Sequence, residues 1–539
     1  MKVKKITAAA LSAAIIASAA LMASCKPKND ANTLYVELNN AGFGVEWIDP
    51  LIEIFEDEHP GITVEKTYIT KGSVQILDKI DSGSTNLDIV FIERSFKSRE
   101  KAIKANDGNE YPVQYAELTD IYNAKVLGED VLLKDKMRKE SYDQITQTNA
   151  AGEEVQYAFP WMQSYNSIVV NKKVIPSGEW KSGAAFTKMP NTTDEFFAYM
   201  NALKAQHPEI TPTIHSLPST SYWDMVFALW TSQYYGTETM RKFLAEGYHP
   251  DYPDDEDLKF SADIMKNEGL LAALVVLERI VNPENGYSKA DDQSLNFTQV
   301  QNKFLETSNK VLFNPNGLWL EREMSANYDP QELDIEFIRM PVVSALGEKL
   351  GIDDTTLSAL IEWIDGGKQG NAPQIDSKKS VAAEDVIAAV TDARQMHVAN
   401  SGFNALIPAY STKIALAKEF LQLMATERGM EAMFEKCGSA APFKYSAEKL
   451  DALKAAGKLS AFTYSGNTLA SSGTFTYGKT NNFFTLNSLG VFSQMDSAAA
   501  FFAAPDKKDR KTAVALWDDY GSMMQAQWNT YLRKAGITR

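Results

Sequence analysis

Residues 33–70 read TLYVELNNAGFGVEWIDPLIEIFEDEHPGITVEKTYIT, and this stretch decides the fold class. Its first apolar run, which ends at two asparagines, predicts a strand, and ITVEKTYI near its end predicts a second. Between them Trp47, Leu51 and Phe55 recur at helical spacing, and Pro50 is tolerated in a first helical turn. The stretch therefore predicts a strand, a helix and a strand.

The same alternation continues along the chain. GSVQILDKIDSG (72–83) predicts a second helix, and LDIVFIE (87–93) is apolar enough for a buried parallel strand. The alternation returns in YNSIVVNKKVI (165–175) and in TTDEFFAYMNALKAQHP (192–208). Repeated strand–helix units of this kind predict an α/β fold of the doubly wound type.

Length and charge limit the function classes. The chain has 539 residues, which is long enough for two or more domains. Its 70 acidic residues outnumber 54 basic ones and give a net charge of −16. Because a nucleic-acid partner requires a basic surface field, this balance argues against nucleic-acid binding.

The N-terminus has the pattern of an export signal. Three lysines in the first five residues precede an apolar stretch at 6–23 and small residues before Cys25. This predicts a removable signal peptide at 1–24. The ending LMASC resembles the bacterial lipobox, in which the cysteine is acylated, although Met22 stands where leucine is usual. The alternative is plain secretion after cleavage at a nearby small residue.

If Cys25 carries lipid, the polar segment 25–32 is a short tether between the membrane and the folded body. Cys437 is then the remaining cysteine, so no internal disulfide is expected.

A tryptophan stands at an unusual place in KVLFNPNGLWLEREM (310–324). The run KVLFNP predicts a strand that breaks at Pro315, Asn316 and Gly317, and a short helix follows. Trp319 lies just past this break. It is either a core residue or a platform on which a ligand stacks.

Several motifs in their order resemble the extracellular solute-binding proteins of carbohydrate ABC transporters, the maltose-binding-protein superfamily. They are LYVELNNAGFGVEWIDPLIEIFEDEHPGITVEKTY (34–68), LDIVFIE (87–93), AFPWMQSYNSIVVNKKVI (158–175), NPNGLWLEREM (314–324) and GFNALIPAYSTKIALAKEFLQLM (402–424). The resemblance covers nearly the whole mature chain. It is closest to the branch that binds N-acetylglucosamine, chitobiose and similar oligosaccharides.

The resemblance implies two α/β lobes joined by a multi-strand hinge, with sugar bound in the cleft between them. Residues 33–159 and 342–440 would form the N-terminal lobe, and residues 161–340 and 442–539 the C-terminal lobe. Hinge closure on the ligand is the motion expected of such proteins.

The resemblance also implies partners and a location. The ligand would be a mono- or oligosaccharide, and the closed protein would deliver it to the permease subunits of an ABC transporter. The protein would be a monomer without a cofactor, held at the extracellular face of the cytoplasmic membrane by its lipid alone.

The candidate ligand contacts follow from sugar chemistry and from the resemblance. A sugar ring has a C–H face that aromatic planes cover and a hydroxyl rim that carboxylates, amides and arginine satisfy. The family tryptophan that matches Trp319 stacks on ligand. Trp47 and Trp223 are equally well explained as core residues of their helices. The candidate contacts are Glu46, Trp47, Glu93, Arg94, Trp161, Gln163, Tyr165, Trp223, Asn316, Gly317 and Trp319.

An enzyme is the weaker interpretation. Glycosidases need two carboxylates that face each other, and Glu321 and Glu323, two residues apart on one helix, do not. The histidines lack metal-ligand spacing, and no nucleophile elbow or phosphate-binding glycine loop occurs, so no metal is expected. The alternatives are a receptor of the same build for a peptide, and a surface glycan hydrolase.

Overall fold

The computed structural model describes residues 30–534, except 95, 97, 99, 217–221, 227, 439–441, 477–500 and 502–509. The predicted signal peptide and Cys25 lie outside the described residues. Within the described part of the chain, no helix is long and apolar enough to span a membrane.

The first strand–helix units form as the sequence predicts. β1 (Thr33–Asn40) is followed by α2 (Asp49–Glu58), β2 (Thr63–Thr70), α3 (Ser73–Asp81) and β3 (Ile89–Glu93). β1 pairs in parallel with both β2 and β3, so it lies between them. The apolar side chains of β3 are buried because the strand lies inside the sheet, whereas β2 is at an edge and alternates toward solvent.

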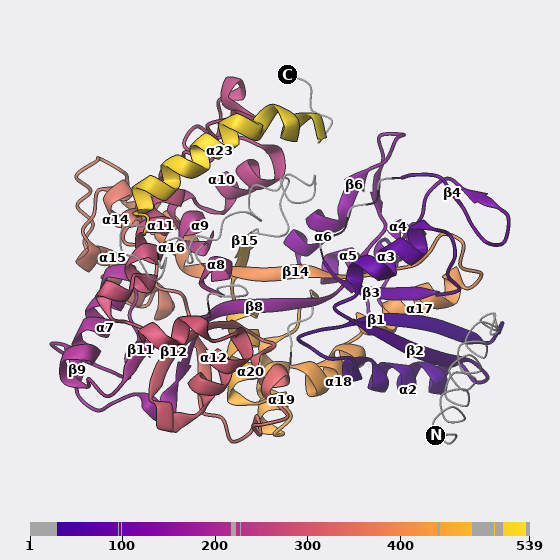
Figure 1. Cartoon of the computed structure of the whole chain (residues 1–539), viewed down its shortest axis with the longest axis horizontal. Coiled ribbons are helices and arrows are strands. Elements are labelled where there is room, and N and C mark those ends of the chain that lie inside the picture. The colour runs from indigo at the N-terminus through magenta and orange to yellow at the C-terminus, as the bar shows by residue number, and fades with distance from the viewer. Residues whose placement is uncertain are drawn as a thin grey trace, which may run out of the picture.

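Among the described residues these strands belong to one nine-stranded mixed sheet, in the order β11-β12-β8-β14-β3-β1-β2, with β13 paired to β8 and β15 to β14. Its other strands are β8 (Phe159–Asn171), β11 (Thr211–Thr213), β12 (Val311–Gly317), β13 (Ile335–Ile338), β14 (Met396–Leu406) and β15 (Thr474–Thr476). The protein has two α/β lobes, and the long strands β8 and β14 run between them (Figure 1).

Helices cover both lobes (Figure 1). In the lobe built on β1, β2 and β3 they are α2, α3, α4 (Thr119–Tyr122), α5 (Leu133–Lys136), α6 (Lys139–Ile145), α17 (Ile414–Met424) and α18 (Glu427–Cys437). In the other lobe they include α7 (Thr193–Gln206), α8 (Tyr222–Val226), α9 (Ala228–Tyr235), α11 (Glu268–Val281), α12 (Phe297–Leu305), α13 (Leu320–Met324), α15 (Asp354–Asp365), α16 (Ala383–Gln395) and α23 (Ala513–Lys534).

The predicted strand break at Pro315 is wrong. β12 continues through Pro315 to Gly317 and pairs antiparallel with β8 along this whole length. A proline has no backbone N–H to donate to a second neighbouring strand. On the edge of β12 that faces away from β8, the pairing with β11 includes only Val311 and Phe313, so Pro315 does not need to donate there. Pro315 therefore leaves no ladder bond unmade.

The described residues form two hydrophobic cores, which do not follow the predicted lobe boundaries at every point. The first core includes β1, β3 and α17, but also Val311, Leu320 and Phe337. The second includes α7, α9 and α11, together with buried residues from Val342 to Met396. The boundaries of the lobes remain a proposal, and segment 342–396 packs with the second core.

Candidate ligand-binding site

The indole of Trp319 is buried in the first hydrophobic core, where the end of β12 and α13 meet the segment after β1. Its ring meets Phe43, from the loop after β1, edge to face at 6.3 Å between centroids, and meets Tyr222 of α8 at 5.8 Å. A Cβ at Gly317 would lie 2.4 Å from Trp319 Cζ3, and one at Gly42 would lie 3.1 Å from Trp319 Cβ. Glycine at these positions makes room for the indole, which residues from both lobes cover.

Two carboxylates lie near this indole, one from each lobe. Glu93 ends β3, and burial together with the charge of Glu323 raises the pKa of Glu93 to about 8, although the Asn39 side chain hydrogen-bonds it. Burial also raises the pKa of Glu323 to about 6, against a 2.7 Å hydrogen bond from Gln301 Nε2 and the charge of Lys71. Burial and the repulsion between the two carboxylates therefore both favour a proton held by the pair.

Gly42 connects the carboxylate pair to the indole. A Cβ at Gly42 would lie 3.4 Å from Glu323 Oε1 as well as against Trp319. Burial and the charge of Glu323 also raise the pKa of the Tyr222 hydroxyl. The aromatic rings and the carboxylates are thus parts of one cluster.

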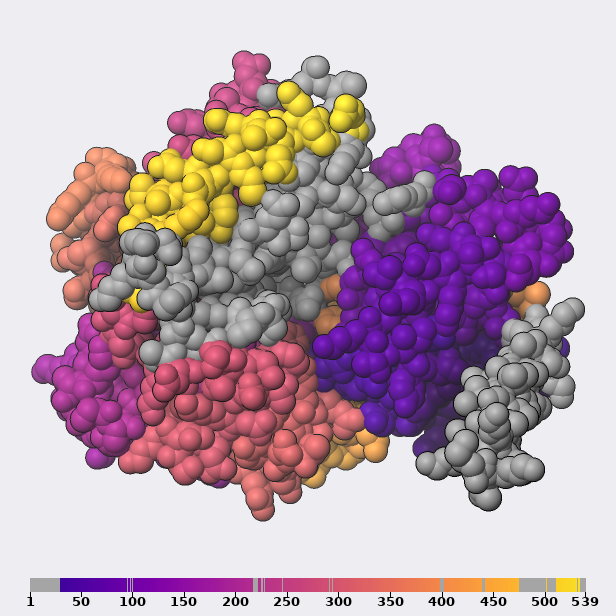
Figure 2. All heavy atoms as spheres, viewed as in Figure 1, coloured from indigo at the N-terminus to yellow at the C-terminus, as the bar shows by residue number. Residues whose placement is uncertain are grey.

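An ion pair closes the edge of this junction. Arg322 of α13 donates to Glu46, the first residue of the short 3-10 helix η1 (Glu46–Ile48) that precedes α2. Partial burial opposes ionisation of Glu46, but backbone amides and the charge of Arg322 hold the pKa of this carboxyl below its usual value. The side chain of Glu46 is 56% exposed and that of Arg322 is 31% exposed, so the pair is a surface contact between lobes. Figure 2 shows the salmon segment, to which α12 and α13 belong, beside the indigo N-terminal segment.

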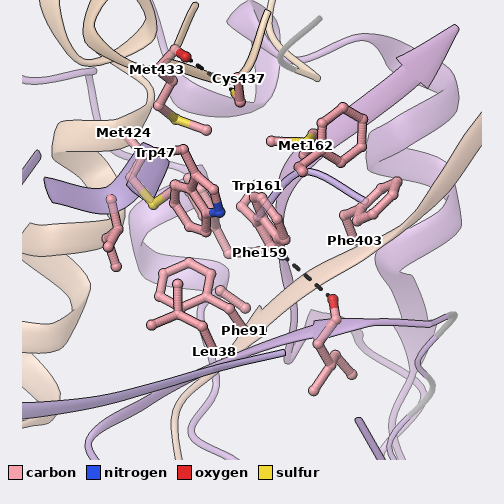
Figure 3. Close-up of a cluster of buried hydrophobic side chains, with 14 of the residues drawn as sticks. Leu38, Trp47, Phe91, Phe159, Trp161, Met162, Phe403, Met424, Met433 and Cys437 are labelled. Atoms are coloured by element: carbon pink, nitrogen blue, oxygen red, sulfur yellow. Dashed lines mark hydrogen bonds between the residues drawn. The ribbon is translucent and has the colours of Figure 1, made fainter. Parts of the chain in front are cut away.

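Trp47 and Trp161 were predicted as ligand contacts, and the structure places both in the first apolar core. Their rings stack with centroids 4.3 Å apart and 14° between planes (Figure 3). Phe91 meets both edge to face, and Trp161 Nε1 donates to the Ile92 carbonyl oxygen at 3.4 Å. They are 1% and 2% exposed, so the site that we propose below does not include them.

Trp223 also lies in a core, since it is fully buried and stacks on Trp230 in the second core. Gln163 and Tyr165 are buried within β8. Tyr165 packs edge to face on Phe337 at 5.1 Å, so it belongs to the core beneath the junction.

The remaining candidates support or border the site. Asn316 is buried in β12, where its Oδ1 accepts a 2.9 Å hydrogen bond from the Gly317 amide. It shapes the strand end that leads into Trp319. The side chain of Arg94 is exposed, and its charge acts on the hydroxyl of Tyr115.

Sequence reasoning missed several members of the cluster. Asn39, Phe43 and Gln301 were not singled out, and Glu323 was considered only as a poor partner for Glu321 on the same helix. A signal existed for Asn39, because it stands at the carboxyl end of a parallel strand, where α/β sheets bind ligands. No local signal pairs Glu323 with Glu93, since the contact joins residues from different lobes.

The cluster has the chemistry of a site for a polyhydroxylated ligand. The rings of Trp319, Tyr222 and Phe43 offer apolar faces, and Glu93, Glu323 and the neighbouring amides offer hydrogen-bonding groups. In the described ranges, no group of three or more histidine, cysteine or acidic residues is arranged to hold a metal ion.

The two-lobe fold with polar and aromatic groups at the junction defines the class of binding proteins that hold ligands between domains. A sequence model of the bacterial extracellular solute-binding proteins matches residues 44–431. This chain belongs to that family. A comparison with curated proteins found no match.

Solved structures of sugar-binding proteins share the fold. The GacH receptor of Streptomyces glaucescens, determined unliganded and with acarbose, superposes with a TM-score of 0.52 at 14% identity, over 94% of this chain and 99% of that one. A structure from work on xylan utilisation by Caldanaerobius polysaccharolyticus gives 0.55 at 12%, over 92% and 99%. A chitin oligosaccharide binding protein gives 0.54 at 14%, over the same shares. At these identities the likeness concerns the fold alone.

Proposed function

We propose that this protein captures a sugar, of oligosaccharide size, between its two lobes and presents it to an ABC importer. One observation carries the proposal: Trp319, Glu93 and Glu323 lie together at the junction of the lobes. The aromatic plane would cover the C–H face of a sugar ring, and the carboxylates would accept hydrogen bonds from its hydroxyl rim.

Ligand capture by closure fits the way the lobes touch. Phe43 and Glu46 of one lobe contact Trp319 and Arg322 of the other. A ligand that bridges both sets of groups stabilises the closed state by the contacts it makes there and loses on opening. Membership of the family and the sugar-binding relatives with the same fold support a sugar as the ligand.

The proposal includes an anchor at the N-terminus. The lipobox-like LMASC predicts that Cys25 is acylated, so that the body stays at the extracellular face of the cytoplasmic membrane. The protein then acts as a monomer beside the permease subunits, with the lipid as its sole contact with the bilayer.

A titration tests the proposal directly. The mature protein in mild detergent is screened by thermal shift against a panel of oligosaccharides, and hits are titrated by calorimetry. A bound ligand raises the melting temperature by mass action. Small-angle scattering should then give a smaller radius of gyration with the cognate sugar. If no oligosaccharide of the panel raises the melting temperature and peptides bind instead, the protein is a peptide receptor and the proposal is wrong.

A glycan hydrolase is the second candidate, and the Glu93–Glu323 pair is the observation in its favour. Burial raises the pKa of both carboxyls, and that of Glu93 further because Glu323 repels it, which is a condition under which one acts as an acid and the other as a base. Chromatography of the bound oligosaccharide separates the two functions. A receptor returns the sugar intact, whereas a hydrolase returns shorter products.

A further inference from the structure

We propose that the site between the lobes selects a sugar that carries a protonated amine, which Glu93 and Glu323 bind from opposite lobes. This inference rests on the proposed function and names the ligand class of the same site. It follows from an excess of hydrogen-bond acceptors in the cluster.

Two buried acceptor atoms of the cluster have no hydrogen-bond partner among the described residues, Glu93 Oε1 and Gln301 Oε1. Gln301 is fully buried, and its amide group lies at the cluster because its Nε2 donates to Glu323 Oε2. A buried acceptor atom without a donor has lost its hydrogen bonds to water and gains none in the protein, so its burial costs the full desolvation free energy. With both carboxylates ionised the cluster therefore lacks a donor, and in the unliganded protein the proton held by the pair is its substitute.

The donors already present are committed or distant. Asn39 hydrogen-bonds Glu93, while its Oδ1 accepts from the Gly72 amide. Arg322 is paired with Glu46 at the edge. Lys71 acts on Glu323 through its charge, and its Nζ lies 5.9 Å from the centre of the Phe297 ring.

The charges that face the pair lead to the same conclusion. Glu93 and Glu323 carry two negative charges when ionised, and Lys71 offsets one of them. The Glu46–Arg322 pair is neutral as a whole, and Tyr222 keeps its proton. The site thus has an uncompensated negative charge, which in the unliganded protein is reduced by the proton on Glu93.

An ammonium group fits this set of acceptors better than other sugar substituents. It has three N–H donors and no acceptor, and its hydrogen bonds to carboxylates are charge-assisted. A hydroxyl brings one donor without charge, an N-acetyl group adds a carbonyl acceptor, and a uronate adds a like charge. When the ammonium binds, Glu93 releases its proton to solvent and the positive charge takes the place of that proton.

Matched sugar sets test the inference. Mono-, di- and trisaccharides of gluco and galacto configuration, with α-1,4 and β-1,4 linkages, are compared as amine, N-acetyl and hydroxyl forms by calorimetry with the mature protein at pH 7. We expect the amine form to bind about tenfold tighter than its hydroxyl counterpart, as one charge-assisted hydrogen bond gives. The heat of binding should depend on the buffer, because a proton is released.

Variants connect the preference to the two carboxylates. Glu93→Gln should weaken binding of both forms, reduce the ratio of amine to hydroxyl affinity to about twofold or less, and abolish the proton release. Glu321→Gln is the matched control. This neighbouring glutamate of α13 accepts from Ser460 and Thr463 of another helix, so the preference should persist. Circular dichroism confirms that each variant is folded.

The outcomes separate the two proposals. If hydroxyl or N-acetyl sugars bind as tightly as the amines, the inference is wrong and the proposed function stands. An amine preference that survives Glu93→Gln also overturns the inference, since it assigns the preference to other groups. If no sugar of any set binds, the proposed function fails, and the inference fails with it.

Discussion

Replacing Trp319 with alanine measures whether the lobe junction is a ligand site or only packing. The indole is 7% exposed, but its neighbours come from both lobes and include Phe43 and Tyr222. If a sugar ring stacks on it, the variant should lose about 1–3 kcal/mol of binding free energy, which is about one to two decades in Kd. A fully buried tryptophan costs about 3–5 kcal/mol of stability on truncation. Because part of the cover of Trp319 is an interlobe contact, we expect a smaller loss, about 1–3 kcal/mol.

Trp223→Ala is the matched control, since Trp223 is fully buried in the second core. It should lose about 3–5 kcal/mol of stability and leave the affinity of the folded fraction nearly unchanged. Urea unfolding and calorimetric titration of both variants give the two quantities. The reasoning is refuted if Trp319→Ala loses as much stability as Trp223→Ala while its folded fraction binds sugar normally.

Three further predictions concern the anchor, the junction and pH. Growth with labelled fatty acid should label the protein but not Cys25→Ala, and equal labelling of both would exclude acylation at this residue. Arg322→Ala should favour the open state by no more than about 1 kcal/mol, because the ion pair is exposed. Scattering should then give a larger radius of gyration for the ligand-free variant. An unchanged radius would show that the pair does not hold the lobes together. Burial raises the pKa of Glu321 from 4.5 to about 7, so its stabilising effect is full below about pH 4.5 and is lost as the pH rises to 7. In urea melts the free energy of unfolding of the wild type should therefore fall on the order of 2–3 kcal/mol between these pH values, and that of Glu321→Gln should not show this fall. If the variant has the same pH profile as the wild type, Glu321 is not the cause.

Local patterns in the sequence predicted the fold correctly. The strand at Thr33–Asn40, the helix with Leu51 and Phe55 on its inner face, and the buried strand at Ile89–Glu93 all formed as expected. Each depends on periodicity within one short segment, and the apolar face has to be buried wherever the element packs. The break at Pro315 failed because a proline ends strand pairing only where a second neighbouring strand needs its N–H.

The candidate site was harder to predict, because an aromatic residue at a strand end serves a core as well as it serves a ligand. Trp47, in the 3-10 helix before α2, stacks on Trp161 of β8, and neither segment alone indicates this partner. Trp319 has similar sequence surroundings and belongs to the same core, but its ring contacts Tyr222 of α8 as well as Phe43. What separates these cases is long-range packing, which a single sequence does not contain.

The arrangement of the junction also determines how ligand and closure are coupled. If the protein closes on its ligand as we propose, with Glu93 and Glu323 on different lobes, the energy of bringing the two carboxyls together is a cost of closure and not of folding either lobe. Closing the empty protein at neutral pH requires one of them to keep a proton in a buried place. A ligand that donates to both carboxylates replaces that proton and removes the repulsion in the closed state alone. Under the proposed function, the binding energy of such a ligand would shift the equilibrium toward closure, and the closed state would be the one that an importer recognises.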